Sequence, residues 1–200
     1  VHCSILVYKN MSALRYWIWP PQFDNKEIKT LNKFIDHNYL ELEPKEGAAS
    51  GSSGKRLKQE RHTKLIEWQK IEPYFKKVYG YAEEIITHEF GYITFKMFDD
   101  RLINFATYTS KEKDYYGWHV DRSPEGKNFD VKGTLLINMS DTPYKGGDLR
   151  LFNQGPETVT DFKKPGSMIL FDGFMSHEVT PVTQGTRKTI AIFMTGPKWR

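Results

Sequence analysis

Apolar positions in the N-terminal part of the chain recur every three to four residues, which is the spacing of one face of an α-helix. Asp24 is a suitable N-cap for a first helix, and Glu27, three residues later, completes a capping box. The apolar face of this helix follows at Ile28, Leu31, Phe34 and Ile35. A second amphipathic segment contains Leu65, Ile66, Trp68 and Gln69. We expect Pro73 to open another helix, which continues past Gly80, and we expect a flexible loop at residues 47–54, which read GAASGSSG.

After about Glu89 the period of the apolar pattern falls to two, as in a β-strand with one buried face. Residues 92–98 alternate in this way and predict a strand. Six further short runs are rich in β-branched or aromatic residues and are bounded by Gly, Pro, Asn or Asp, which also predicts strands. These runs are residues 104–109, 134–139, 148–152, 158–162, 167–171 and 189–195.

About eight short strands that follow a set of helices predict an α+β fold that is mainly β. We expect a double-stranded β-helix (jelly roll) of two sheets, with helices packed outside one of them. The prediction is a single domain over residues 1–200, with helical support in about residues 12–88 and the jelly-roll core in about residues 89–200. A nucleotide-binding βαβ architecture is disfavoured, because no Gly-rich phosphate loop follows a strand.

Composition and charge narrow the class of protein. The hydrophobic fraction of 38% and the charged fraction of 27% fit a soluble globular protein. No run approaches the roughly 18 apolar residues of a membrane helix. The net charge of +4 is modest, and the basic residues between 55 and 77 alternate with glutamates, which is typical of a solvated helix face and disfavours nucleic-acid binding.

Cys3 is the only cysteine, so an internal disulfide and a thiolate metal site are both excluded. The apolar run at residues 5–8 is too short for the core of a signal peptide. We therefore expect an intracellular, cytoplasmic protein, with a phage gene in a bacterial host as one origin. Val1 and Met11 leave the true N-terminus open.

The segment Gly117-Trp118-His119-Val120-Asp121 carries the first candidate chemistry. A strand sends alternate side chains to one face, so His119 and Asp121 can point at the same spot. A third ligand must come from elsewhere, and His177 lies in a later strand region. Two imidazoles and one carboxylate on one face of an octahedron leave three positions open, which suits a non-haem Fe(II) ion that activates O₂. The alternative for a lone His-x-Asp pair is a hydrogen-bonded loop histidine.

Arg187 adds a second feature, ten residues after His177. A turn at Gln184-Gly185 would reverse the chain and place Arg187 on the neighbouring strand, inside the same barrel. A buried arginine needs an anionic partner, and its planar guanidinium suits a carboxylate. A dicarboxylate such as 2-oxoglutarate can bridge the two features, with one end on the metal and the other on Arg187. The alternative is a surface arginine that begins a strand.

At these residues the sequence resembles the 2-oxoglutarate- and Fe(II)-dependent dioxygenases of the prolyl 4-hydroxylase type, and it is most similar to the PKHD-type hydroxylases of bacteria and phages. The resemblance covers roughly residues 104–195, about half of the chain, and several motifs occur in the right order and spacing. They are Tyr108, residues 119–121 (HVD), 146–149 (GGDL), 164–171 (KPGSMILF) and 177–182 (HEVTPV), and Arg187.

The resemblance implies the roles of six residues. His119, Asp121 and His177 become the iron ligands, and Arg187 becomes the partner of the 2-oxoglutarate C5 carboxylate. Tyr108 resembles a family tyrosine that helps to position the co-substrate, and Thr189 adds a hydroxyl beside the same carboxylate; the alternative for Tyr108 is a core tyrosine. The implied cofactors are Fe(II), 2-oxoglutarate and O₂, with ascorbate as a further candidate. The implied reaction is hydroxylation of a prolyl residue in a protein or peptide.

Other substrates remain open at the level of the sequence, including a free amino acid, a small molecule or a nucleobase. The AlkB-like demethylases, which act on nucleobases, carry a second arginine six residues after the first, and this chain has Phe193 there. The third reading is a non-catalytic jelly-roll protein that binds a metal. Two departures from relatives leave the substrate undefined: the charged loop at residues 109–114 and Asn138, which stands where some relatives have an aromatic contact to the co-substrate.

Overall fold

The computed structural model describes residues 16–40, 61–97, 102–121 and 128–199. The loop expected at residues 47–54 lies outside these ranges. Helix α1 (Asn25–Asn38) begins as predicted: the Asp24 side chain accepts hydrogen bonds from the backbone N–H groups of Lys26 and Glu27, and the Glu27 side chain accepts one from Asp24. Its buried residues are Ile28, Leu31, Asn32 and Ile35.

Helix α2 (Trp68–His88) continues past Gly80 as expected, but the prediction for its start was wrong. Pro73 lies inside the helix, and residues 62–67 form a strand, β2 (His62–Glu67), instead of a helical segment. In β2 only Lys64 and Ile66 are buried, a period of two that is too short to separate from a helical pattern in the sequence. The N-terminal part of the chain is therefore not only helical.

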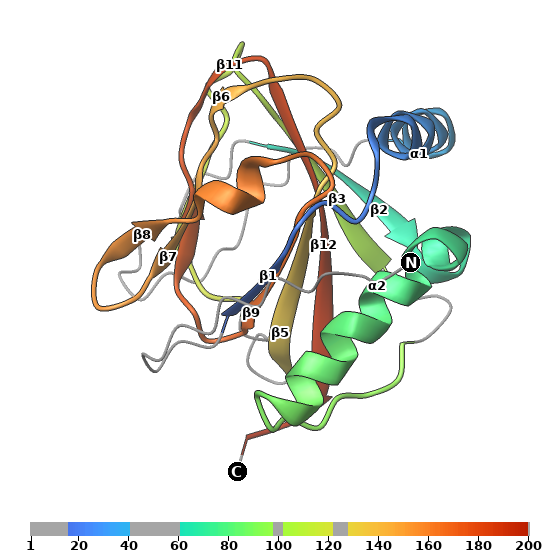
Figure 1. Cartoon of the computed structure of the whole chain (residues 1–200), viewed down its shortest axis with the longest axis vertical. Coiled ribbons are helices and arrows are strands. Elements are labelled where there is room, and N and C mark those ends of the chain that lie inside the picture. Colours follow the sequence, from blue (N-terminus) through green and yellow to red (C-terminus); the bar gives the residue numbers. More distant parts are fainter. Residues whose placement is uncertain (1–15, 41–60, 98–101, 122–127, 200) are drawn as a thin grey trace.

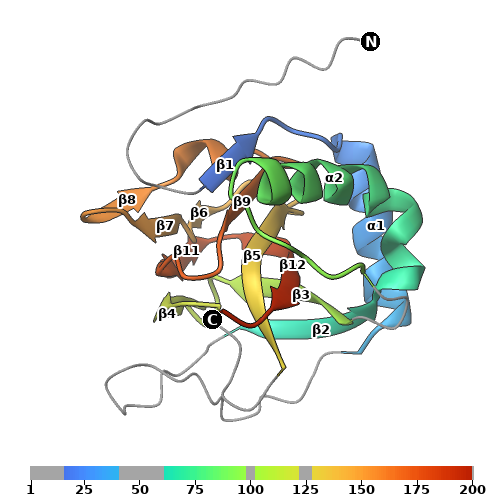
Figure 2. The same cartoon turned by 90° about the horizontal axis from the view of Figure 1, so that it is seen from below.

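Two facing sheets form the jelly roll (Figures 1 and 2). The six-stranded sheet has the order β1-β9-β5-β12-β3-β2, and the four-stranded sheet has the order β4-β10-β7-β8. The strands of the first are β1 (Tyr16–Trp19), β9 (Met168–Asp172), β5 (Phe129–Asn138), β12 (Thr186–Pro197) and β3 (Leu102–Thr109), with β2 at the edge. Those of the second are β4 (Tyr116–His119), β10 (His177–Val179), β7 (Leu149–Phe152) and β8 (Pro156–Thr158). A small pair joins β11 (Val182–Gln184) and β6 (Lys145–Gly146).

Two predicted strands differ from the structure. Residues 91–97 form no regular strand, although Phe95 donates a backbone hydrogen bond to the carbonyl of Thr195. The run 158–162 is mostly the short 3₁₀ helix η1 (Thr160–Lys163), which follows β8. The other predicted runs correspond to β3, β5, β7, β9 and β12.

The alternation of side chains along the six-stranded sheet divides its two faces. On β12, Ile190, Ile192 and Met194 belong to the large core beneath α1 and α2, which cover the outer face of the sheet (Figure 2). The alternate residues, including Arg187 and Thr189, face the space between the two sheets and line a pocket there. The period-two pattern thus places the outer core and the pocket on opposite faces of the same strands. Neither of the two described helices has the length and apolar character needed to cross a membrane.

Candidate metal centre

Three of the predicted site residues meet on adjacent strands of the four-stranded sheet. His119 ends β4 and His177 begins β10, and the two residues are direct partners in the antiparallel pairing of these strands. Asp121 lies two residues beyond the end of β4, with Val120 pointing outward at 41% exposure. The sequence placed His177 only in a later strand region, and the structure shows that its strand pairs directly with the strand of His119.

The ligand atoms of these residues converge. His119 Nε2 lies 3.5 Å from Asp121 Oδ1, and His177 Nε2 lies 3.4 Å from Asp121 Oδ2. One donor atom from each of the three residues lies within 4.8 Å of the others, a spacing that a single metal ion can occupy. All three side chains are largely buried. Two imidazole nitrogens and one carboxylate oxygen are the donor set of a non-haem Fe(II) site with open positions.

Hydrogen bonds to the backbone fix both imidazole rings. His119 Nδ1 lies 2.8 Å from the carbonyl of Gly117, and His177 Nδ1 lies 3.0 Å from the carbonyl of Met175. Because a carbonyl only accepts, each neutral ring carries its proton on Nδ1 and keeps a lone pair on Nε2, the atom that faces Asp121. The Thr134 hydroxyl, on β5 of the opposite sheet, donates to Asp121 Oδ2 at 2.7 Å and holds the carboxylate.

The electrostatics of the site favour the protonation states that bind a metal. Burial would raise the pKa of the Asp121 carboxyl, but His177, His119 and the Thr134 hydroxyl together lower it to about 2. Burial lowers the pKa of His177 to about 4, against the opposing effect of Asp121. At neutral pH, His177 is therefore neutral and Asp121 is charged, and both are ready to coordinate a cation.

Arg187 faces this cluster from the six-stranded sheet. It lies on β12 and pairs with Tyr108 of β3, so its strand neighbours belong to the opposite sheet and not, as the sequence suggested, to the strand of His177. Its side chain is 1% exposed, and Nε and Nη2 have no hydrogen-bond partner. Nη1 lies 3.4 Å from the hydroxyl of Thr189, and no described carboxylate forms an ion pair with the guanidinium. A buried cation with free donors is the complement of an anion.

All six predicted site residues line one pocket between the sheets. Tyr108 is 2% exposed, and the Arg187 guanidinium lies 5.0 Å from the centre of its ring. The apolar part of the lining comes from Ala106, Leu136, Val179, Ala191 and Phe193. The pocket thus combines a cluster of metal-binding atoms, an unpaired buried guanidinium and apolar walls. The donor set fits Fe(II), and the guanidinium fits a carboxylate of 2-oxoglutarate.

The sequence missed Asn104, Arg61 and Tyr116, which also line the pocket, and two of them, Arg61 and Tyr116, contact predicted site residues. Arg61 Nη1 donates to the Tyr108 hydroxyl at 3.0 Å, and its guanidinium lies 4.2 Å from the centre of the Tyr116 ring. Tyr116 in turn stacks on His119, with 3.6 Å between ring centres. Arg61 falls within the basic stretch that the sequence assigned to a solvated helix face. No motif marks it, because its position depends on β2 joining the edge of the sheet.

The pKa values of these two residues reflect their burial in the pocket. Burial would lower the pKa of the Arg61 guanidinium, but Tyr108, Tyr116 and Asp121 outweigh it and raise the value. Burial raises the pKa of Tyr116 to about 12, against the opposing effect of Arg61. Arg61 is therefore a permanent cation beside a neutral phenol.

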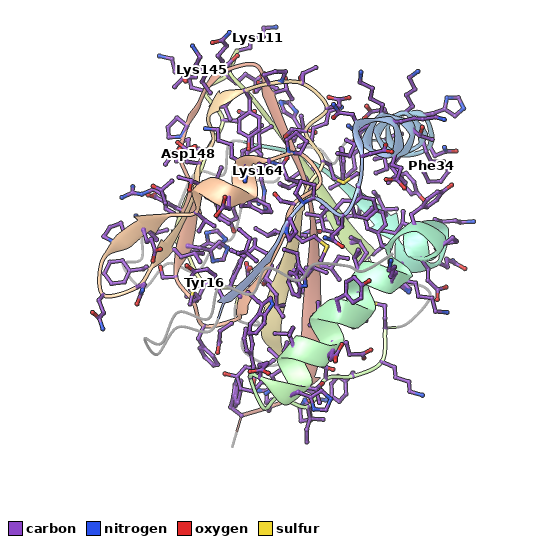
Figure 3. The ribbon with its side chains drawn as sticks, viewed as in Figure 1. Tyr16, Phe34, Lys111, Lys145, Asp148 and Lys164 are labelled. Carbon is purple, nitrogen blue, oxygen red and sulfur yellow. The ribbon has the colours of Figure 1, made fainter. Side chains whose placement is uncertain are left out.

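Asn138 and the charged loop have structural roles in the described part of the chain. Asn138 is fully buried, and its amide donates to the carbonyls of Phe162 and Lys163. In the loop, buried Asp114 accepts a hydrogen bond from the backbone N–H of Thr109. The backbone N–H of Ser110 donates to the carbonyl of Gly185, which ties the loop to the turn before β12. Lys111 of the loop lies at the same end of the molecule as Lys145 of β6 (Figure 3).

The chain is similar to known proteins in sequence over its C-terminal half. The family described as the 2OG-Fe(II) oxygenase superfamily matches residues 103–195. A PKHD-type hydroxylase of Nitrosomonas eutropha is 37% identical over 98 residues, which are 45% of this chain and 40% of the relative. A PKHD-type hydroxylase of Bordetella pertussis is 38% identical over 81 residues, 36% of this chain and 34% of the relative. The chain thus spans about two fifths or less of the length of these curated relatives.

Solved structures match over more of the chain. A prolyl-4-hydroxylase of Pseudomonas putida has a TM-score of 0.60 at 14% identity, covering 91% of this chain and 92% of that chain. The viral collagen prolyl hydroxylase of Paramecium Bursaria Chlorella virus-1, solved in complex with 2OG, has a TM-score of 0.67 at 15% identity, covering 92% of this chain and 97% of that chain. At these identities the likeness establishes the fold, and it confirms the predicted jelly roll.

Proposed function

We propose that this chain, whose residues 103–195 match the 2OG-Fe(II) oxygenase superfamily, is an Fe(II)- and 2-oxoglutarate-dependent dioxygenase that hydroxylates a C–H bond. The favoured substrate class is a prolyl residue of a protein or peptide, which is supported by the prolyl hydroxylases among the structures of similar fold. One observation carries the proposal: a two-histidine, one-carboxylate cluster shares a pocket with a buried guanidinium that has unpartnered donors.

In this proposal each predicted residue has a defined role. His119, Asp121 and His177 hold Fe(II), and Arg187 binds the C5 carboxylate of 2-oxoglutarate beside Thr189 and Tyr108. When bound, Fe(II) supplies the redox chemistry by which O₂, 2-oxoglutarate and the substrate R–H give succinate, CO₂ and R–OH. The oxygen atoms balance, since one atom of O₂ enters succinate and the other enters the hydroxyl group. The chain itself contributes position, charge and the exclusion of water.

We further propose that residues 1–200 act as one oxygenase domain. Strands β1 and β2 from the N-terminal part form the two edges of the six-stranded sheet, and α1 and α2 pack on its outer face. These elements share a core with β3, β5, β9 and β12, the sheet that also carries Arg187, and this shared core supports the proposal of a single domain. The proposed place of action is the cytoplasm, and the single Cys3 is compatible with it, since this sequence forms no internal disulfide.

Anaerobic titration tests the proposal directly. Addition of Fe(II) and then 2-oxoglutarate to the folded protein should produce a weak visible charge-transfer band, because a 2-oxo acid that chelates Fe(II) absorbs there. Exposure to O₂ should then yield succinate, and proline-containing peptides screened beside free amino acids should increase the rate. Folded protein that gives neither the band nor succinate would contradict the proposed activity.

A further inference from the structure

The charges in the pocket do not balance. Its lining holds two guanidinium groups, Arg61 and Arg187, and a single carboxylate, Asp121. With neutral histidines the lining therefore has an excess of one positive charge, and a divalent metal raises it to three. 2-Oxoglutarate brings two negative charges. One positive charge is left after the metal and the co-substrate are both in place, and a low-dielectric pocket makes such a charge costly unless an anion accompanies it.

Arg61 is the cation that has no anionic partner when 2-oxoglutarate binds the metal and Arg187. Arg187 is the deeper of the two at 1% exposure, whereas Arg61 is partly exposed and directly precedes the edge strand β2. The deeper guanidinium suits the molecule that binds first and is enclosed. The more accessible one suits the molecule that enters afterwards.

The local contacts of Arg61 hold its guanidinium in place and leave part of it free. Nη1 is used by the Tyr108 hydroxyl, and the flat face of the group rests on Tyr116. Nε is buried and has no hydrogen-bond partner, and among the described residues no carboxylate forms an ion pair with Arg61. The Tyr108 hydroxyl and the Tyr116 ring thus hold the Arg61 guanidinium in one orientation, and one of its N–H donors is unused. Such a guanidinium is pre-organised to bind a planar anion.

We propose that Arg61 binds a free carboxylate of the molecule that is hydroxylated, so that the substrate is the C-terminal residue of a peptide rather than an internal residue. The inference rests on the proposed function and names the substrate class of that site. A carboxylate is favoured over a phosphate, because the pocket has one charge left to neutralise and a carboxylate is a monoanion. The guanidinium plane also matches the plane of a carboxylate.

Tyr116 connects this carboxylate site to the metal centre. Its ring lies between the Arg61 guanidinium and the His119 imidazole, within 4.2 Å of the first and 3.6 Å of the second. A carboxylate held by Arg61 is therefore only one aromatic ring away from a metal ligand. Arg61 lines the same pocket as the three metal-binding residues, so a molecule held by Arg61 lies in that pocket with them.

Binding measurements on protein loaded with Mn(II) and 2-oxoglutarate test the inference without turnover. The probes are the common L-amino acids, Gly-Gly tripeptides that end in the same residues, and the C-terminal amides of both sets. Calorimetry and thermal shift should find at least one free acid that binds about tenfold or more tightly than its amide, the range of a charge-assisted hydrogen bond. Whether the amino acid or the tripeptide shows the larger difference identifies the source of the carboxylate.

Four variants assign this difference to Arg61. Arg61→Gln should remove the preference for the acid and change the Kd of 2-oxoglutarate less than about threefold, and Arg61→Lys should retain part of the preference. Arg187→Gln should weaken 2-oxoglutarate instead, by about tenfold or more. Lys76→Gln, which removes one charge at an exposed position of α2, is the control and should alter neither Kd. Circular dichroism verifies the fold of each variant.

The outcomes separate the two levels of the proposal. Acids and amides that bind equally to the wild-type complex would overturn the carboxylate site, and so would an Arg61→Gln variant that loses 2-oxoglutarate as Arg187→Gln does. Both results leave the proposed dioxygenase in place, since 2-oxoglutarate still binds to the wild type. A folded wild type that fails to bind 2-oxoglutarate with Mn(II) rejects the proposed function itself and the inference with it.

Discussion

At the scale of single residues, the pocket carries charges that the protein alone does not neutralise. Arg187 is enclosed with one neutral hydroxyl as its hydrogen-bond partner, and two of its nitrogen atoms have none. Buried donors without partners destabilise a folded protein, by about 1–3 kcal/mol each. The resting protein is therefore less stable than its core would allow, and the free energy is recovered when an anion binds.

Replacement of Arg187 by Met should separate stability from binding. Met fills a similar volume without unsatisfied donors, so we expect the free energy of unfolding of the ligand-free protein to rise by about 1–3 kcal/mol. Binding of 2-oxoglutarate should be lost. Urea denaturation with and without Mn(II) and 2-oxoglutarate measures both effects. A variant that is less stable than the wild type without ligand would show that Arg187 has a structural partner.

Thr134 contacts a proposed metal ligand, Asp121, but is not itself a ligand. Its hydroxyl donates to Asp121 Oδ2, so Thr134→Val should keep the shape of the side chain and release the carboxylate. We expect metal affinity to fall by about tenfold, the lower range for groups that orient a ligand. Competition with a chelator measures the change, and Thr30→Val on the exposed face of α1 is the matched control. Equal metal affinities in the two variants would show that Thr134 has no role in metal binding.

At the scale of elements, the site depends on a connection that the sequence marks with two glycines. Gly146 ends β6, and Gly147 follows with a φ of 58°, in the left-handed region that favours glycine. A Cβ atom on Gly147 would lie 3.0 Å from Cδ of Arg187 and 2.9 Å from Cγ2 of Val182. The small residue therefore makes room for the arginine. Asp148 comes next and pairs with Lys163, which fixes the end of this connection.

Gly147→Ala should consequently affect both stability and the co-substrate. The left-handed backbone and the close contacts predict a loss of about 1–3 kcal/mol in the free energy of unfolding. The displaced Arg187 should weaken 2-oxoglutarate binding more than metal binding. Gly155→Ala is the control, since a Cβ atom there meets nothing within 4 Å. If the two alanine variants bind 2-oxoglutarate equally well, Gly147 has no part in positioning the arginine.

The elements also show where sequence reasoning succeeds and where it stops. The capping box at Asp24 and Glu27 was predicted correctly, because the interaction is local. Strand β2 was read as helical, because its assignment depends on pairing with β3, a partner that is remote in the sequence. Because β2 was read as helical, the sequence also failed to place Arg61, which directly precedes β2, in the pocket. The pairing of His119 with His177 likewise required the register of β4 and β10.

At the scale of the whole molecule, a sandwich of two sheets brings together residues that are far apart in the sequence. The spacing of His119, Asp121, His177 and Arg187 was sufficient to suggest their common site, since each motif has a chemical reason of its own. The sequence did not reveal that these residues divide between the sheets. His119 and His177 stand on the four-stranded sheet, and Arg187 stands on the six-stranded sheet with Tyr108.

In the proposed function, this division would give 2-oxoglutarate a mechanical role in addition to its chemical one. A molecule that contacts both the histidine side and the arginine side acts as a removable cross-link between the two halves of the barrel. Its conversion into a shorter acid would shorten that cross-link during each catalytic cycle.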